Sequence, residues 1–325
     1  MSKRAILWIF ILAMAFMISS CVPVEDGGRD SSGTSSYSSQ GVVVSFIDNL
    51  PPSTFHVDEG MNRGANFEIG VHIQNKGEFP RTETGSLYGK LYLTGYDRNI
   101  LRDGRWERDN QFNMLPGVSS SYPQGDSKYM TYTVNDIYYP VDSRQYSMNL
   151  MLNACYYYET SATATVCVDP DYRGDRADKP CRVGDVRLDP QKAPVQVTNI
   201  DASATSSELI YVMTIQNRGG GKVLFDRGGS GAVSDGNCLN PDHDEKDRVI
   251  VHASVTGLPR GRCSPEGSVS NPLRIYQGSE NIVCRFPLDS VSTDSAYTTQ
   301  MNIDLRYGYR TRTSREVTLI NMDRH

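Results

Sequence analysis

The sequence predicts an all-β protein, in which two tandem antiparallel β-sandwiches follow an N-terminal signal or anchor helix. Three observations lead to this prediction. Apolar and polar residues alternate along short segments, these segments recur in the same order, and no segment of helical period follows the leader. The 19 Tyr, 28 Gly and 16 Pro residues also favour strands and turns over helices.

The N-terminus has the features of a secretory signal. Lys3 and Arg4 precede an uncharged apolar run over residues 5–18, and small residues then lead to Cys21. A positive start, a short apolar core and small residues before a cleavage point are typical of signal peptides. The stretch Ile18–Cys21 also resembles the lipobox of prokaryotic lipoproteins, in which the cysteine is acylated and becomes the new N-terminus.

We therefore expect residues 1–20 to be a signal peptide or membrane anchor, with lipidation at Cys21. Two alternatives stay open: a fully released protein, or an uncleaved anchor, because the run approaches the roughly 20 residues that span a bilayer. Each alternative places the remaining chain outside the cytoplasm, at the cell surface or in the periplasm. The Ser/Gly-rich segment 21–41 is expected to be a disordered tether, because it has little apolar surface to bury.

Composition limits the size of the folded body and the class of partner. The 325 residues leave room for two ordinary domains beyond the leader. A net charge of −5 and a pI of about 5.6 give no reason to expect nucleic acid as a partner. We expect attachment to a membrane through the N-terminus and contact with a surface protein or another cell-envelope component.

A tandem repeat is the strongest internal signal. Phe67–Gly77 (FEIGVHIQNKG) recurs as Leu209–Gly219 (LIYVMTIQNRG), and both segments end in Gln-Asn, a basic residue and Gly. The alternation is that of a half-buried strand, and Asn and Gly favour a tight turn after it. Three further matches keep the same order: 91–95 with 253–257, 124–125 with 277–278, and 148–160 with 299–311.

The repeats predict two β-sandwich domains of the immunoglobulin or fibronectin type, residues 42–168 and 195–325. The charged, proline-containing segment 169–194 is expected to be an extended linker. The strand that ends in Asn-x-Gly, the following Leu-Tyr-Leu strand and the late Tyr-rich hairpin resemble the CARDB-type domains of prokaryotic surface lipoproteins. The chain is also similar to uncharacterised two-domain archaeal proteins. The resemblance implies an immunoglobulin-like fold and an adhesion or spacer role without a catalytic centre.

The cysteines predict an oxidising compartment. With Cys21 assigned to the leader, six remain, and an even set in an exported chain indicates disulfides. The first two are equally far from a turn expected near Ser161, which favours a cross-strand bond, and two others flank a predicted strand pair. Spacing alone leaves the connectivity open. The expected pairs are Cys155 with Cys167, Cys263 with Cys284, and Cys181 with Cys238.

Two acidic clusters are calcium candidates, because alternate oxygen ligands suit a hard cation. In the linker cluster, however, Arg173 and Pro180 stand where an EF-hand loop needs oxygen ligands. A solvated linker and a solvated loop are the other interpretation. The candidates are Asp169, Asp171 and Asp175 in the linker, and Asp242, Asp244 and Asp247 in a later loop.

Signatures of enzymes and resident metals are missing from the sequence. The five histidines lack metal-ligand spacing, and Ala232 breaks a nucleophile elbow at Ser230. We expect no catalytic activity and no cofactor. The expected role is adhesion, structure or protein interaction, and the alternative is binding of an extracellular glycan or other ligand by loops at one end of a sandwich.

A series of arginines near the C-terminus alternates with Leu305, Tyr307 and Tyr309. We expect a strand whose polar outer face carries the arginines over an apolar inner face. An anionic polymer such as a cell-wall glycan is the alternative explanation for this charge. The series consists of Arg306, Arg310, Arg312 and Arg315.

Overall fold

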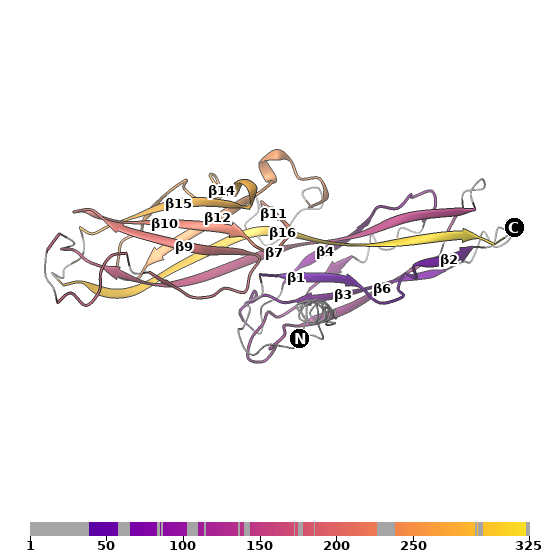
Figure 1. Cartoon of the computed structure of the whole chain (residues 1–325), viewed down its shortest axis with the longest axis horizontal. Coiled ribbons are helices and arrows are strands. Elements are labelled where there is room, and N and C mark those ends of the chain that lie inside the picture. Colours follow the sequence, from indigo (N-terminus) through magenta and orange to yellow (C-terminus); the bar gives the residue numbers. More distant parts are fainter. Residues whose placement is uncertain are drawn as a thin grey trace, which may run out of the picture. The chain divides into compact units, whose positions relative to one another are not determined.

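The structure is a computed structural model of the chain. Contacts within the chain separate Met1–Ser36 from a second unit, Tyr37–His325, whose fold is shown in Figure 1. The predicted signal or anchor, Cys21, the tether up to residue 38, and Asp175 lie outside the described residues. The described residues are 39–57, 66–82, 85, 87–102, 110–113, 115–135, 137–139, 144–171, 173–174, 178–184, 186–225, 238–289, 291 and 295–322.

Strands dominate the described residues, as the sequence predicts, with short 3₁₀ turns at His243–Glu245 and Tyr276–Gly278. The first repeat contributes β1 (Val42–Phe46), β2 (Thr54–Val57), β3 (Phe67–Asn75), β4 (Gly89–Thr94), β5 (Gln111–Phe112), β6 (Ser127–Val134) and β7 (Gln145–Val168). The linker contributes β8 (Arg187–Leu188). The second repeat contributes β9 (Val195–Ala204), β10 (Glu208–Asn217), β11 (Lys222–Leu224), β12 (Arg248–Val255), β13 (Arg262–Ser264), β14 (Leu273–Arg274), β15 (Ser279–Pro287) and β16 (Tyr297–Asn321).

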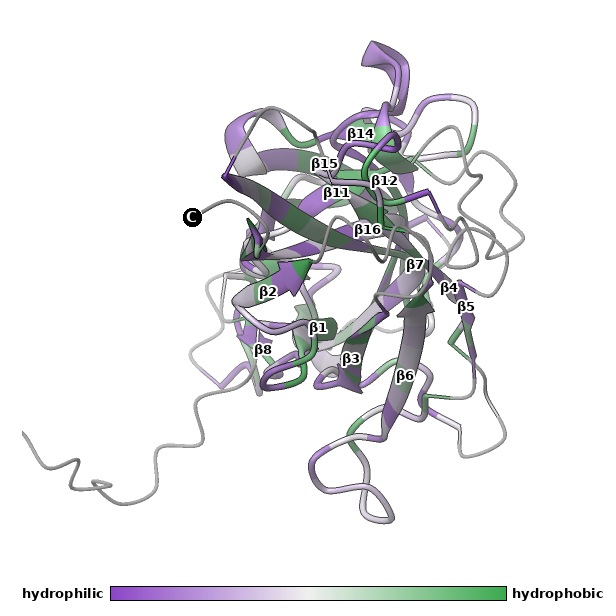
Figure 2. Cartoon of the chain, turned by 90° about the vertical axis from the view of Figure 1, so that its right-hand side faces the viewer, coloured by the Kyte–Doolittle hydropathy of each residue, from purple (hydrophilic) through white to green (hydrophobic). Residues whose placement is uncertain are grey.

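The strands form two small sheets and one large sheet. The first repeat builds the order β1-β3-β6, and the second builds the corresponding order β9-β10-β15 with β13 added at its edge. The large sheet has the order β14-β12-β16-β7-β4-β5, and β2, β8 and β11 join its long strands. Among the strand pairs of the described residues, β2 with β16 is parallel and the others are antiparallel. The antiparallel, sandwich-like architecture is therefore confirmed, and Figure 2 shows apolar and polar residues alternating along these strands.

The two long strands of the large sheet join the repeats. β7 has 24 residues and β16 has 25, and they pair in one register from Gln145↔Ile320 to Val168↔Tyr297. The turn expected near Ser161 is wrong, because Ser161 lies inside β7 opposite Asp304. The segment around it contains no Gly, Pro or Asn to begin a turn, so the strand continues into the other half. The two predicted domains thus share one sheet.

One face of β7 serves both halves of the molecule. Every even-numbered residue from Met148 to Val168 is buried, so a single alternation runs through the strand. Leu152 lines a small space together with Ile69 of β3, whereas the hydroxyl of Thr160 donates to the carbonyl of Val195 in β9. The small sheets of both repeats therefore pack along the same face of β7.

The pairing of β7 with β16 relates the repeats by a local two-fold axis. Tyr157 and Gly308 are equivalent in the sequence repeat, and they pair with each other. On each side of this pair, a residue of β7 faces the repeat equivalent of the β7 residue that lies equally far on the other side. Such a register corresponds to an approximate two-fold axis through the Tyr157–Gly308 pair.

The disulfides correct two of the three expected pairs. Cys155 and Cys167 lie on one continuous strand, about 40 Å apart at 3.3 Å per residue, and are too distant to bond. The expected Cys263–Cys284 bond is confirmed, since these residues are direct partners in β13 and β15. The bonds are Cys155–Cys238, Cys167–Cys181 and Cys263–Cys284.

The segment predicted as an extended linker is attached to the first repeat. β8 pairs with the C-terminal part of β7, at Ala164↔Leu188, and Cys181 is bonded to Cys167 at the end of the same strand. The side-chain amide of Gln191 then exchanges two hydrogen bonds with the backbone of Val197, which covers part of the free edge of β9.

Candidate functional site

Four tyrosines form a buried cluster at the junction of the repeats. Their rings meet in tilted or edge-to-face contacts, with centroids 5.9 to 6.2 Å apart. Each long strand contributes two of the rings, and the ring contacts follow the local two-fold axis. The four residues are Tyr156, Tyr158, Tyr307 and Tyr309, all of which are fully buried.

In both repeats, the second cluster tyrosine of the long strand bonds the Asn-x-Gly turn in the same way. The hydroxyl of Tyr158 accepts a hydrogen bond from the backbone N–H of Phe79 at 3.2 Å. In the second repeat the hydroxyl of Tyr309 accepts from the backbone N–H of Gly221 at 2.8 Å. The equivalent hydrogen bonds show that the repeated tyrosines hold the repeated turns.

The asparagines of these turns repeat the pattern. The side-chain amide of Asn75 donates to the carbonyl of Phe79 at 2.6 Å, and that of Asn217 donates to the carbonyl of Gly221 at 3.0 Å. In each turn the asparagine oxygen also accepts from the backbone N–H two residues later, at 3.2 Å. The Gln-Asn-basic-Gly motif therefore has a structural role in both halves.

The tyrosine cluster joins the strands through its hydroxyl groups. The hydroxyl of Tyr156 accepts a hydrogen bond from the backbone N–H of Val42 in β1, and that of Tyr307 accepts one from the backbone N–H of Val195 in β9. Burial raises the pKa of all four phenols above the usual tyrosine value, and that of Tyr309 to about 12. Neutral phenols at physiological pH join strands by hydrogen bonds and supply no base.

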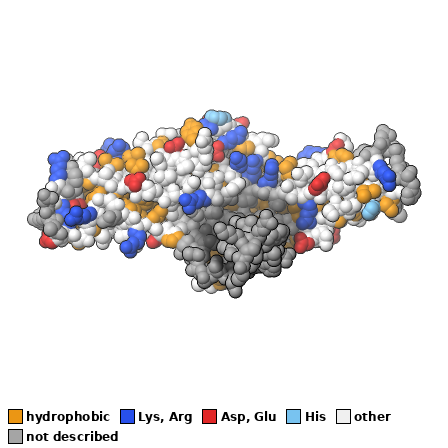
Figure 3. Space-filling model, viewed as in Figure 1, with side chains coloured by type: hydrophobic (Ala, Val, Ile, Leu, Met, Phe, Trp, Pro, Cys, Tyr) orange, Lys and Arg blue, Asp and Glu red, His pale blue; other side chains and the backbone are white. Residues whose placement is uncertain are grey.

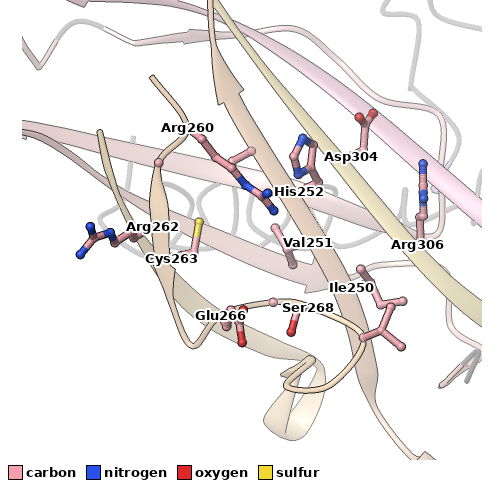
Figure 4. A pocket seen from close by; sticks show the side chains of 14 residues that line it. Ile250, Val251, His252, Arg260, Arg262, Cys263, Glu266, Ser268, Asp304 and Arg306 are labelled. Carbon is pink, nitrogen blue, oxygen red and sulfur yellow. The ribbon is translucent and has the colours of Figure 1, made fainter. Parts of the chain in front are cut away.

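An open hollow of about 940 Å³ beside β12 is the candidate ligand site (Figure 4). It is formed by β12, by the outer face of β16, and by the segment that carries β13 and the following loop. The backbone N–H of Val251 donates to the carbonyl of Gly267 at 2.8 Å, which fixes this loop against β12. The polar and charged residues that line the hollow are His252, Arg260, Arg262, Glu266, Ser268, Asp304 and Arg306.

The pairing of β12 with β16 brings charged residues of both strands together at this hollow. His252 is the direct partner of Asp304, and Ile250 is the partner of Arg306. The guanidinium of Arg306 lies 3.4 Å from the carboxylate of Glu159 on β7. In Figure 4, Arg260 extends from the loop side toward His252.

The chemistry of the hollow suits binding. Guanidinium groups, an imidazole and carboxylates offer both donors and acceptors to a polar ligand. The hydroxyl of Ser268 lies 3.0 Å from that of Ser270, so these two groups are engaged with each other. This site is not evident from the sequence, because its residues come from three separate segments that the fold brings together.

The predicted arginine series divides between two environments. Arg306, Arg310 and Arg312 project from the outer face of β16, in keeping with the alternation. Arg315 has the opposite parity, and its guanidinium donates to the carbonyls of Ile47 and Pro51 at 2.8 and 3.2 Å. The expectation of one shared outer face is therefore wrong for Arg315, which holds the loop after β1.

Two of the calcium candidates, Asp169 and Asp244, are paired with basic side chains. In the linker, the ammonium of Lys179 lies 2.7 Å from the carboxylate of buried Asp169, and it also contacts the carbonyl of Asp171. The ammonium of Lys179 thus supplies the counter-charge for Asp169. In the later loop Asp244 pairs with Arg248 at 3.2 Å, Asp242 precedes the 3₁₀ turn, and Asp247 adopts a φ of 58°. Within the described ranges, no three His, Cys, Asp or Glu residues are placed to hold a metal.

Comparison with known proteins gives no family. No family model matches the sequence, and no curated protein is detectably similar to it. Among the residues that the structure describes, no helix is long and apolar enough to cross a membrane. The three disulfides indicate an oxidising, extracytoplasmic environment.

Proposed function

We propose that the chain is an extracytoplasmic surface protein, anchored to a membrane through its N-terminus, with a non-enzymatic adhesion, structural or protein-interaction role. The observation that carries the proposal is the use of the cysteines. All six after Cys21 are in disulfides, which leaves Cys21 as the one cysteine available for lipidation. An exported chain with that distribution matches a lipoprotein with an oxidised extracytoplasmic body.

The joined repeats support a role as one interaction module. Two immunoglobulin-like, CARDB-type modules joined by separate linkers would move relative to each other. Here the paired strands β7 and β16 run through both halves, and the tyrosine cluster is packed at their junction. We propose that this continuity makes the two repeats one firm interaction module.

Metabolic labelling tests the anchor. We expect the full-length protein to incorporate labelled palmitate and to remain with membranes after a salt wash, whereas Cys21→Ala loses the label. Added protease should digest the body on intact cells or spheroplasts, because it lies outside the cytoplasm. A Cys21→Ala protein that keeps its label, or a body that is protected until cells are lysed, would contradict the proposal.

A second candidate function is binding of an extracellular glycan or another polar ligand. The hollow beside β12 favours it, because its volume of about 940 Å³ and its mixed charges suit a polar ligand of several rings. Glycan-array binding that is lost in Arg260→Ala would move the assignment toward this function, and an array without binding would count against it.

A further inference from the structure

A second hollow, of about 440 Å³, has a strong excess of positive charge. It lies next to β11 and β16, and its ionisable lining residues are Lys222, Lys246, Arg310 and Asp247. Asn240 and Pro241 also line this hollow. Three cations against a single carboxylate distinguish this hollow from the mixed one beside β12.

The cations are held together by strand register. Lys222 on β11 is the direct partner of Arg310 on β16, and Lys246 bridges to Leu224 at the end of β11. Like charges directly opposite each other on neighbouring strands destabilise a sheet. Within the described part of the chain, no carboxylate lies within ion-pair distance of Lys222 or Lys246. Among the described residues, the repulsion between these cations is thus relieved by no ion pair to either lysine.

Arg310 is fixed in place by neutral groups. Its guanidinium donates to the carbonyls of Cys238 and Leu239, at 2.8 and 3.0 Å. The Cys155–Cys238 disulfide attaches this wall to β7, whose Cys155 is the partner of Arg310 on the other side. Burial, and then the neighbouring Arg312, lower the pKa of Arg310.

We propose that this hollow binds an anionic saccharide unit, a sugar that carries a phosphate or sulfate group. Its volume is that of a small-molecule site and exceeds what a single inorganic anion fills. The two lysines bind the anionic oxygens as mobile point charges, and Arg310 contributes a fixed positive charge. Asn240 and Asp247 supply an amide and a carboxylate for the sugar hydroxyls. The site does not depend on where the protein is anchored, so it goes beyond the function proposed above.

Calorimetric titration of the full-length chain in detergent tests the site, with glucose 6-phosphate as the free probe and heparin as the polymer probe. We expect saturable binding at low salt that weakens as salt is added, since exposed charges are screened. Lys222→Gln with Lys246→Gln should weaken binding by about tenfold or more. Arg310 is left unchanged, because its hydrogen bonds also hold the wall.

Two controls make the result specific. Arg285→Gln removes a positive charge from an exposed residue of β15, outside the lining of the hollow, and should leave the affinity unchanged. Neutral glucose should not bind. Binding of glucose 6-phosphate supports a free ligand, and binding of heparin alone supports a polymer. The proposal is overturned if neither probe binds at low salt, or if Arg285→Gln weakens binding as much as the lysine variant.

Discussion

Replacing both Cys155 and Cys238 by alanine should lower the free energy of unfolding by about 4 to 5 kcal/mol. The bond closes a loop of 83 residues, and the entropy that a cross-link removes from the unfolded chain grows with loop length. Both cysteines are buried, so alanine leaves no unsatisfied polar group. Denaturant unfolding followed by tyrosine fluorescence measures the change.

The Cys167–Cys181 bond provides the matched control. It closes only 14 residues, and alanine at both positions should cost about 3 kcal/mol. The difference between the two variants isolates the contribution of loop length. A larger loss from Cys167–Cys181 than from Cys155–Cys238 would show that the long bond does not tie the second repeat to β7 as described.

Gly77→Ala should lower the free energy of unfolding by about 3 kcal/mol or more. An added Cβ would overlap the hydroxyl of Tyr158 and lie 2.9 Å from the carbonyl of Lys192. The ring must then move, which strains a packed core and breaks the hydrogen bond from Phe79. The cost is steric, because Gly77 is not among the residues with positive φ.

A double-mutant cycle identifies the clash. Removing the hydroxyl with Tyr158→Phe should make the additional cost of Gly77→Ala smaller than it is in the native protein. Gly219→Ala tests the symmetry, because its Cβ would overlap the hydroxyl of Tyr309 in the second repeat. Additive effects in the cycle, or a change below about 0.5 kcal/mol in both glycine variants, would contradict the assigned role of the turns.

The repeat and its strands were predictable because they depend on local patterns. Alternation located β3 and β10, and the matched glycines Gly95 and Gly257 both adopt positive φ, at 80° and 86°. The glycines at 125 and 278 also match, with φ of 72° and 89°. Local sequence thus determines both strands and turns within each repeat.

The way in which the repeats join was not predictable by the same means. A Tyr-rich strand followed by another alternating segment suits a hairpin as well as one long strand, and only pairing with β16 selects the latter. The disulfide pairs depend on this choice. The turn wrongly expected near Ser161 therefore also led to the wrong expected bond between Cys155 and Cys167. The role of Lys179 beside Asp169 and the two hollows arise from contacts between distant segments.

β7 is one continuous strand shared by both repeats, and its continuity can be measured. Spin labels at the exposed positions Asn149 and Thr165, measured by pulsed electron resonance, test it most directly. A continuous strand of this length places the labels about 50 Å apart at 3.3 Å per residue. A separation of about 25 Å would mean that the strand turns near Ser161, and would contradict the shared sheet.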